Sequence, residues 1–401
     1  MADKIGKSRI IVQSDWDQVL QERCGKAWVA FRKPEKPGIY GELMSHGISS
    51  NGVPRVTSGD GFNVESITRK RITVSYDDQD SGTVHRCSFL APVVTYYSVH
   101  GLKRSVVDLA VTPGGLAVSC DSLGKMKIWT TDNGEVRRDL EGHLGDVYSC
   151  RFFPSGVVIL SGSADMRLKI WSAETGQCAA TLIGHNGAIN DTAIIERGRN
   201  VVSVSSDGTA RLWDCGSQTC LTTVWAGCGR IGGCAIGTPL SGCLPSSLPQ
   251  EVNEVGTEGK MLLLACDNGH LRGHALQGGE EIFDLSCCDA VNCCTFVSDT
   301  LVVCGTQDGH IYLIDIRNTS VPLKIQSESR SAILSLLPSR QGVYISTGDG
   351  SCFYQNQSFE TMTELTGPDL DSVYRVATDG CFLYTASRDG SVRKYICPAD
   401  D

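Results

Sequence analysis

One internal repeat constrains the fold of this chain more than any other feature of its sequence. The segments that begin at Gly142 and at Gly184 align almost without gaps. Each places a His 22 positions before an Asp and a Trp 6 positions after that Asp: His143, Asp165 and Trp171 in the first, and His185, Asp207 and Trp213 in the second. Apolar residues alternate between these positions, which is typical of short strands. Such repetition predicts stacked copies of one strand-rich unit.

The repeated residue types suit a structural hydrogen-bond network. An Asp carboxylate can accept from the Nδ1–H of His, and a Ser hydroxyl and a Trp indole N–H would complete a partly buried network. The Ser is either Ser161 or Ser163 in the first segment and either Ser203 or Ser205 in the second. A Ser-His-Asp catalytic triad is the alternative. Because the trio recurs while a catalytic site is needed once, we expect a scaffold and not an enzyme.

The two segments resemble the WD repeat, which opens with Gly-His and closes with Trp-Asp. Trp213–Asp214 matches the closing pair, whereas Trp171 is followed by Ser172. Asp residues at expected turns continue the period at intervals of 42, 60, 41, 41 and 40 positions: Asp165, Asp207, Asp267, Asp308, Asp349 and Asp389. The one long interval contains a Pro/Ser/Gly-rich insertion at about 237–259.

An earlier copy of the repeat runs from His100 to Trp129. Leu123 stands at its Asp position and Asp121 is displaced by two residues, so we expect an incomplete network in this copy. Together with the six Asp turns, this copy predicts seven blades of a β-propeller over residues 100–397.

The closure of this ring can be predicted from its ends. The last copy supplies three strands, so a fourth strand must come from elsewhere in the chain. CSFLAPVVTYYSV, just before His100, has a suitable length and composition. We therefore expect a propeller domain over 86–401 that is closed by a strand at about 86–99, because closure removes the open sheet edge.

Residues 1–85 lack the repeat spacing and predict a separate, small α+β domain. SDWDQVLQER is typical of a helix with Ser14 or Asp15 as its N-cap. AWVAF, GIYGEL, FNVESI and RITVSY are expected as short strands between Gly and Pro turns. Asp77–Gly82 is the expected linker. The predicted fold class is thus mainly β, a seven-bladed propeller preceded by this α+β domain.

Charge and composition narrow the classes of partner. The 401 residues carry a net charge of −9, which argues against nucleic acid and anionic membranes. The N-terminus has no apolar h-region, and apolar runs such as Met261–Ala265 have the length of a strand, so we expect neither a signal peptide nor a membrane span. The 19 cysteines are then expected as free thiols in a cytoplasmic protein, for which an additional nuclear pool stays open.

Two short motifs suggest a cofactor or a metal but lack the required context. Residues 227–232 match G-x-G-x-x-G, yet a Pro-rich loop follows in place of the helix that a dinucleotide site needs. His270 and His274 lie four positions apart on an expected strand, where they cannot share a helix face as metal ligands would. We expect no cofactor and no metal.

Longer segments resemble one family in particular. EGHLGDVYSCRFFPSGVVILSGSADMRLKIWSAE, RGRNVVSVSSDGTARLWDCG, EVGTEGKMLLLA, GTQDGHIYLIDIR and STGDGSCF are similar to the proteasomal ATPase-associated factor family, and Trp16, Trp28 and GIYGEL extend the resemblance into residues 1–85. The resemblance implies a chaperone of proteasome regulatory-particle assembly. Such a protein would bind the C-terminal domain of an AAA-type ATPase subunit of the base and restrain its premature association with the core particle. We expect it to act as a monomer.

Candidate partner-binding residues lie just before or within the first strands of predicted blades. Acidic residues in these loops could meet Lys and Arg of a partner, and two tyrosines could serve as anchors: Asp146, Tyr148, Asp289, Asp369, Asp371 and Tyr374. Ordinary solvated turn acids are the alternative interpretation. A rival function is a WD-repeat substrate adaptor or a general protein-interaction scaffold, for example for a ubiquitin ligase.

Overall fold

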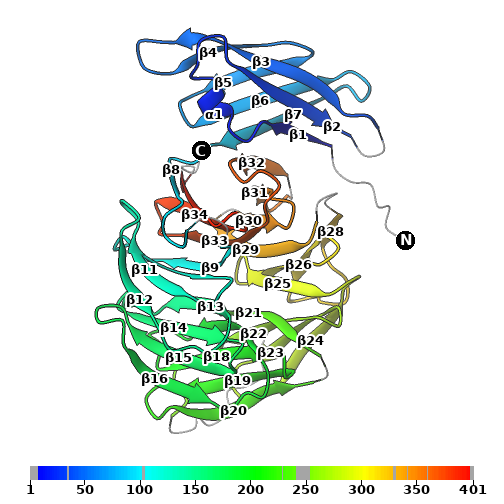
Figure 1. Ribbon diagram of the computed structural model, residues 1–401. Coiled ribbons are helices and arrows are strands. Elements are labelled where there is room, and N and C mark those ends of the chain that lie inside the picture. The colour runs from blue at the N-terminus through cyan, green and yellow to red at the C-terminus, as the bar shows by residue number, and fades with distance from the viewer. Residues whose placement is uncertain are drawn as a thin grey trace.

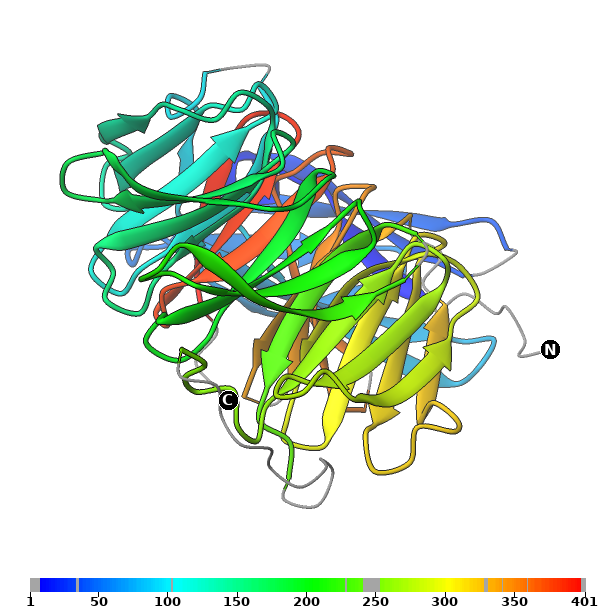
Figure 2. The same ribbon diagram turned by 90° about the horizontal axis from the view of Figure 1, so that it is seen from below.

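The computed structural model describes residues 8–33, 36–101, 104–227, 229–240, 253–327, 331–340, 342–358 and 360–397. Within this part of the chain nearly all regular structure is β-strand, and the one helix is α1 (Trp16–Val19). Figures 1 and 2 show groups of strands following one another in chain order, from cyan through green and yellow to red. The protein is therefore mainly β, as predicted.

Strands β9 to β35 form antiparallel groups in which consecutive strands pair. The groups are β9 (Val106–Val111), β10 (Leu116–Asp121), β11 (Met126–Thr130), β12 (Val136–Leu140); β13 (Val147–Phe152), β14 (Val158–Ser163), β15 (Arg167–Ser172), β16 (Cys178–Ile183); β17 (Ile189–Ile194), β18 (Asn200–Ser205), β19 (Thr209–Asp214), β20 (Thr219–Ala226); β21 (Ile231–Gly237), β22 (Met261–Cys266), β23 (His270–Ala275), β24 (Glu281–Ser286); β25 (Val291–Phe296), β26 (Leu301–Thr306), β27 (His310–Asp315), β28 (Lys324–Ser327); β29 (Ile333–Ser339), β30 (Gly342–Thr347), β31 (Cys352–Asn356), β32 (Thr361–Leu365); and β33 (Val373–Thr378), β34 (Phe382–Ser387), β35 (Val392–Ile396).

The first strands of these groups close into a cycle. Neighbours are in contact in the order β9, β13, β17, β21, β25, β29, β33 and back to β9. Apolar residues from facing sheets fill the space between them, so each pair of neighbouring groups shares a core. This arrangement of four-stranded sheets is consistent with a β-propeller.

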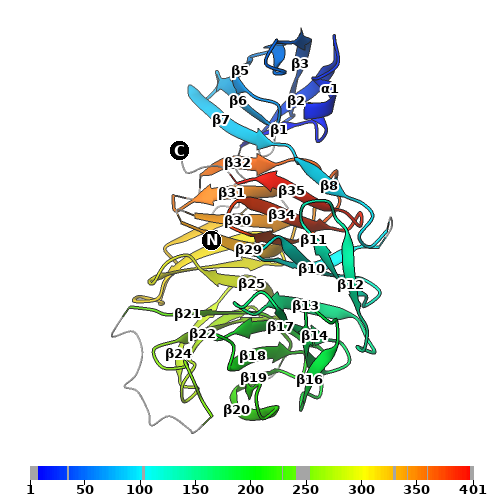
Figure 3. The ribbon, with the colours of Figure 1, turned by 90° about the vertical axis from the view of Figure 1, so that its left-hand side faces the viewer.

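The last group is completed by an early segment of the chain, but a shorter one than the sequence predicts. Only β8 (Val94–Tyr96) pairs with β35, with Tyr96 opposite Val392. The preceding β7 (Thr83–Leu90) instead pairs in parallel with β32 and places Ser88 opposite Thr363. Figure 3 shows β7 directly beside β32. The expected closing strand at 86–99 is thus divided between two sheets, and the expected boundary after residue 85 lies inside β7.

The N-terminal residues form a strand-rich unit joined to the group of β29. β1 (Arg9–Val12), β2 (Lys26–Arg32), β3 (Ile39–Ile48) and β4 (Pro54–Ser58) make one sheet, whereas β5 (Phe62–Ile67) and β6 (Arg71–Asp78) continue the sheet of β7 and β32. Trp16, Phe31, Phe62 and Phe89 belong to the buried core between them.

Two local expectations for this unit differ from the structure. The expected helix in SDWDQVLQER is the single turn α1, and Asp15 at its N-cap makes no capping hydrogen bond with its side chain. The expected linker Asp77–Gly82 is the turn of a hairpin, in which the N–H of Gly82 donates to the carbonyl of Asp78. Lys33 holds this turn through Asp78 (2.6 Å) and Asp80 (2.8 Å), so residues 77–82 connect strands of one sheet and not two domains.

The insertion predicted at 237–259 falls between β21 and β22. Gly237 still belongs to β21, and residues 241–252 lie outside the described part of the chain. The chain beyond them is held against the group of β17 by the buried side chain of Asn200. Its Nδ2 donates to the carbonyl of Asn253 (3.1 Å), and its Oδ1 accepts from the N–H of Val255 (2.6 Å).

Candidate partner-binding face

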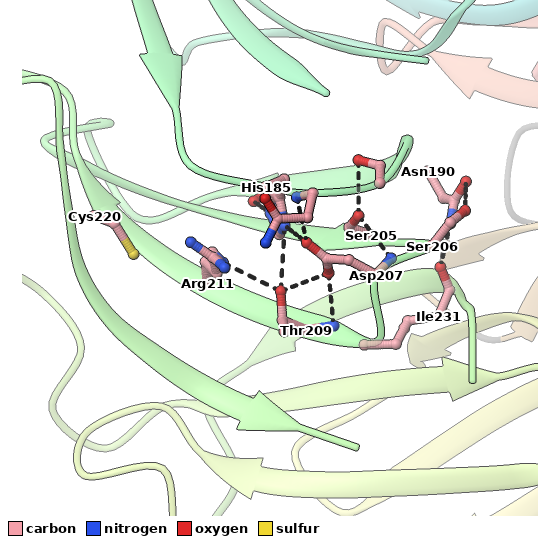
Figure 4. A network of polar contacts seen from close by, with 12 residues as sticks. His185, Asn190, Ser205, Ser206, Asp207, Thr209, Arg211, Cys220 and Ile231 are labelled. Atoms are coloured by element: carbon pink, nitrogen blue, oxygen red, sulfur yellow. Dashed lines mark hydrogen bonds and ion pairs between the residues drawn. The ribbon is translucent and has the colours of Figure 1, made fainter. Parts of the chain in front are cut away.

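The repeated His, Asp and Trp residues form the same buried network in two neighbouring groups. In the group of β13, Nδ1 of His143 lies 2.8 Å from Oδ2 of Asp165, Nε2 of His143 lies 2.6 Å from Oγ of Ser161, and the Trp171 indole donates to that Oγ (2.8 Å). His185, Asp207, Ser203 and Trp213 repeat these contacts at 2.8, 2.7 and 2.8 Å. Figure 4 shows the end of the second network at which His185 meets Asp207, and there Thr209 also donates to Asp207 (2.7 Å).

The structure resolves which serine belongs to each network. Ser161 and Ser203 bind the His and the Trp. Ser163 and Ser205 instead donate to backbone carbonyls of the loop ahead of the inner strand, at Gly145 (3.3 Å) and Gly187 (3.0 Å). One serine therefore completes the buried network, and the other fixes the loop.

A neutral imidazole satisfies this network with every hydrogen bond running in one direction. The Trp N–H donates to the Ser oxygen, the Ser O–H donates to Nε2 of His, and the Nδ1–H of His donates to Asp. Burial lowers the pKa of His143 and His185 below the ordinary value, although the adjacent carboxylates oppose the shift. Burial alone would raise the pKa of Asp165, but hydrogen bonds from His143 and from the N–H of Leu144 outweigh it and hold that pKa low.

The first copy of the repeat also has a complete network, contrary to the sequence expectation. Nδ1 of His100 lies 3.3 Å from Asp121, Nε2 of His100 lies 2.7 Å from Ser119, and the Trp129 indole donates to Ser119 (3.0 Å). Residues two apart on a strand share one face. Asp121 therefore reaches the histidine from the end of β10, and an Asp at the position of Leu123 is not needed.

One backbone hydrogen bond recurs in every group and joins two kinds of loop. The turn after the second strand donates to the carbonyl just before the inner strand: Ser122 to Ser105, Ala164 to Asp146, Ser206 to Ala188, Asp267 to Arg230, Gln307 to Ala290, Gly348 to Ala332 and Arg388 to Ser372, at 2.8 to 3.0 Å. We call the surface that carries these turns and the loops ahead of the inner strands the loop face. Asp267 donates this bond in its group, as Ser206 does in the group of β17. Asp267 is therefore equivalent to Ser206, and Asn268 is equivalent to Asp207. The Asp turn predicted at Asp267 was thus wrong by one residue.

A cavity of about 570 Å³ opens at the centre of the ring. Each inner strand lines it with its second residue: Val107, Tyr148, Asn190, Gly232, Asn292, Leu334 and Tyr374. Charged side chains in the cavity are already paired, Arg151 with Asp191 (2.7 Å) and Arg375 with Asp108 (3.1 Å). These pairs join neighbouring inner strands.

The six predicted partner-binding residues lie on the loop face or at the edge of this cavity. Asp146, Asp289 and Asp369 are exposed in the loops ahead of β13, β25 and β33. Asp371 is half-buried and paired with Arg388 (3.0 Å). Tyr148 and Tyr374 both line the cavity. The acids share one face but belong to groups that are not neighbours in the ring, so the structure does not gather them into one cluster.

Exposed apolar side chains also lie on this face, and the repeat pattern did not predict them. Leu123 and Leu144 lie in the turn and loop beside Asp146, and Leu370 lies between Asp369 and Asp371. Met166 occupies a turn position at which the other groups have glycine. An alignment of the turns would have singled out this methionine.

No metal or cofactor site emerges from the described ranges. They hold no group of three or more His, Cys, Asp or Glu placed to bind a metal ion, and their cysteines are free thiols. His270 binds Asp284 (2.6 Å), whereas Nδ1 of His274 donates to the carbonyl of Gly279 (3.3 Å). In the G-x-G-x-x-G segment Cys228 lies outside the described residues, and the rest leads into β21. None of the described helices is long and apolar enough to cross a membrane.

Comparison with known proteins identifies both the repeat and the family. The family model "WD domain, G-beta repeat" matches residues 134–172, 176–214 and 359–395. Each match begins near or within the outer strand of one group and ends in the third strand of the next, so one sequence repeat spans two neighbouring sheets.

The chain is 50% identical over 388 residues to "Proteasomal ATPase-associated factor 1" of Gallus gallus and of Homo sapiens, covering 96% of this chain and 97% of each relative. "Probable proteasomal ATPase-associated factor 1" of Dictyostelium discoideum is 34% identical over 412 residues, covering 96% of this chain and 95% of that relative. The chain belongs to the proteasomal ATPase-associated factor 1 family.

Proposed function

We propose that this chain is a non-enzymatic chaperone of proteasome regulatory-particle assembly. It binds the C-terminal domain of an AAA-type ATPase subunit of the base and covers it until the mature particle forms, which restrains premature association with the core particle. The observation that carries this proposal is the 50% identity over 96% of the chain to proteins named as factors associated with a proteasomal ATPase.

The scaffold in this proposal is a seven-bladed propeller whose sixth blade is extended by the N-terminal unit. The cycle of contacts among inner strands and the pairing of β8 with β35 support a closed ring. The His–Ser–Trp–Asp networks and the bonds between turns and loops tie the described parts of the loop face to the sheets. Because little order must be gained on binding, such a face is suited to stable protein recognition.

Exposed acids on the loop face support a basic partner surface. Asp146, Asp289 and Asp369 are exposed, and the described residues place no cation in an ion pair with them. Asp371 is already paired with Arg388, so it contributes less free charge. In a chain of net charge −9, these acids speed encounter with Lys and Arg of the ATPase domain and set the register of docking.

A binding assay against each proteasomal ATPase tests the proposal. The full chain is mixed with the separate C-terminal domains and with the full-length subunits, at low and high salt. We expect salt-sensitive binding to one or two subunits and exclusion of the bound subunit from core particles. Recovery of ubiquitin-ligase subunits from a lysate, without binding to any ATPase, would favour the substrate adaptor and overturn the chaperone.

A matched pair of charge reversals tests the acidic residues. Asp289→Lys places a cation on the loop face, whereas Asp299→Lys makes the same charge change in the turn after β25, at the other end of that strand. We expect slower association and weaker salt dependence for Asp289→Lys alone. Equal association rates for the two variants would remove the loop-face acids from the mechanism.

A further inference from the structure

Four apolar side chains project from turns and loops of the loop face, three of them from loops that are in direct contact. Leu144 and Leu370 are 85% and 77% exposed, more than any other large apolar residue described, and Leu123 and Met166 are 62% and 43% exposed. We call these four residues the apolar rim. Isolated exposed leucines are common, but side chains that gather on one face of a soluble protein mark an interaction site.

Two residues of the apolar rim adopt backbone conformations that disfavour their side chains. Met166 has φ +66° and Leu370 has φ +61°. The equivalent turn position of the other groups is a glycine with positive φ: Gly124, Gly208, Gly269, Gly309, Gly350 and Gly390. Glycine adopts this conformation without strain, whereas a bulky side chain does not. The backbone of Met166 is therefore strained, and its apolar side chain is exposed. A glycine at this position would relieve the strain and remove the exposed apolar surface, so the presence of a methionine points to a role outside folding.

The buried network holds Leu144 in place. Its N–H donates to Oδ2 of Asp165 (3.0 Å), the carboxylate oxygen that also faces His143. The same bond in the next group fixes Asn186 through Asp207 (2.9 Å), so the network presents whichever residue follows the histidine. In the group of β13 that residue is a leucine.

The loops that carry Leu123, Leu144 and Met166 are in direct contact. A Cβ at Gly124 would lie 2.7 Å from the carbonyl oxygen of Gly145, and a Cβ at Gly145 would lie 3.2 Å from Cβ of Ala164. Leu123, Leu144 and Met166 therefore project from three loops packed on one another. Leu370 lies in the loop ahead of β33. In the ring, the group of β33 adjoins the group of β9, which carries Leu123, and is two groups away from the group of β13.

We infer that the apolar rim is the hydrophobic anchor of this face and docks into an apolar recess on the C-terminal domain of the ATPase subunit. The inference rests on the proposed function and names the part of the face that supplies affinity. Protein interfaces derive most of their affinity from a few packed apolar anchors, whereas surrounding charges steer encounter. Asp146 and Asp369 lie within two positions of Leu144 and Leu370, so the steering charges border the anchor.

Three full-length variants test the inference by Kd for the ATPase subunit that the wild-type chain binds. Leu144→Ser and Leu370→Ser shorten exposed side chains, and Met166→Gly restores the residue type of the other turns. Val321→Ser is the control, since Val321 is 68% exposed after β27, away from the loop face. We expect each rim variant to lose about tenfold or more in affinity and the control to lose none.

Thermal unfolding of the same variants distinguishes docking from folding. We expect an unchanged Tm for Leu144→Ser and an unchanged or raised Tm for Met166→Gly, since glycine relieves the strain at φ +66°. Weaker binding by a variant of equal or higher stability is not expected of a purely structural residue. If the wild-type chain binds an ATPase and the rim variants bind equally well, the apolar rim is not the anchor. If the wild-type chain binds none, the proposed function fails instead.

Discussion

The indole N–H of Trp16 donates to the side-chain oxygen of Thr366 at 3.2 Å, across 350 residues of sequence. Trp16 is fully buried in the core of the N-terminal unit, and Thr366 begins the loop that carries Asp369 and Leu370. Thr366 also donates through its N–H to the carbonyl of Leu90, and its own carbonyl accepts from Tyr395 (2.8 Å). The N-terminal unit is thus part of the support for one loop of the loop face.

Replacement of Trp16 by Phe tests this support. The change removes the hydrogen bond to Thr366 and leaves a small cavity in the core, so we expect a loss of about 1–3 kcal/mol in the free energy of unfolding. Trp28→Phe is the control, because Trp28 lies in the same unit with its side chain largely exposed. Urea unfolding of both variants measures the difference. An equal effect of the two substitutions would show that Trp16 has no special structural role.

The two serines of β14 provide a matched comparison of the buried network. Ser161→Ala leaves the indole N–H of Trp171 and Nε2 of His143 without their partner in a buried site, and we expect a cost of about 1–3 kcal/mol. Ser163→Ala removes two longer bonds, one donated to the carbonyl of Gly145 (3.3 Å) and one accepted from the N–H of Asp165 (3.2 Å), and should cost less. Chemical denaturation gives both values. The reverse order would mean that loop fixation outweighs the network.

Fixed sequence intervals predicted the His–Asp–Trp networks in the groups of β13 and β17, whose turns are regular. They failed in the group of β9, where the Asp is displaced by two residues. Ser161 and Ser163 lie on the same face of β14, so alternation alone could not choose between them. The same geometry lets Asp121 reach His100, because Asp121 shares one face of β10 with Ser119, and no Asp is needed in the following turn at position 123. A rule based on one interval misses such replacements, whereas a rule based on the face of the strand would find them.

Pairing between distant strands could not be predicted from local patterns. Alternation in residues 83–90 predicts a strand but does not identify its partner. The parallel pairing of Ser88 with Thr363 joins parts of the chain that no turn connects. For the same reason the boundary of the N-terminal unit was misplaced. The apolar rim was missed because exposed leucines in loops carry no periodic signal, and only φ and exposure distinguish them.

Acid should destabilise the networks in two separate ranges of pH. Burial lowers the pKa values of His143 and His185 in the folded protein below the ordinary value of 6.5. Below pH 6.5 these histidines therefore bind protons more readily in the unfolded chain than in the folded one, so the free energy of unfolding falls as the pH falls. The pKa values of Asp165 and Asp207 are lowered despite burial, because hydrogen bonds favour the carboxylates. Their contribution is present above the ordinary value of 3.8 and is lost as the pH falls through the lower folded values.

A variant with His143→Gln and His185→Gln tests the first range. Glutamine does not titrate, so we expect a lower Tm than wild type at pH 7.5 but a smaller further decrease between pH 6.5 and pH 5. Thermal unfolding at a series of pH values measures both slopes. Parallel curves for the variant and the wild type would assign the pH dependence to other groups.

The pairing of Arg375 with Asp108 should contribute to closure of the ring. Arg375 lies on β33 and Asp108 on β9, so the pair at 3.1 Å bridges the last and first inner strands. Asp108 is buried and also accepts from the N–H of Cys150 (2.8 Å), whereas the Arg375 side chain retains some exposure. Arg375→Ala leaves the Asp108 carboxylate buried without its cation. Because solvent partly screens this pair, we expect a loss of about 2–3 kcal/mol, below the range for fully buried pairs.

The matched control for this prediction is an ion pair of similar length at the surface. Lys26 and Glu42 lie 2.9 Å apart with both side chains more than half exposed, and Lys26→Ala should cost less than about 1 kcal/mol. Double replacement of Arg375 and Asp108 by Met and Asn should recover part of the stability lost in Arg375→Ala, because no charge is then left unpaired in the cavity. Urea unfolding of the three variants measures these differences. If Arg375→Ala costs no more than Lys26→Ala, packing between β33 and β9 closes the ring without help from the ion pair.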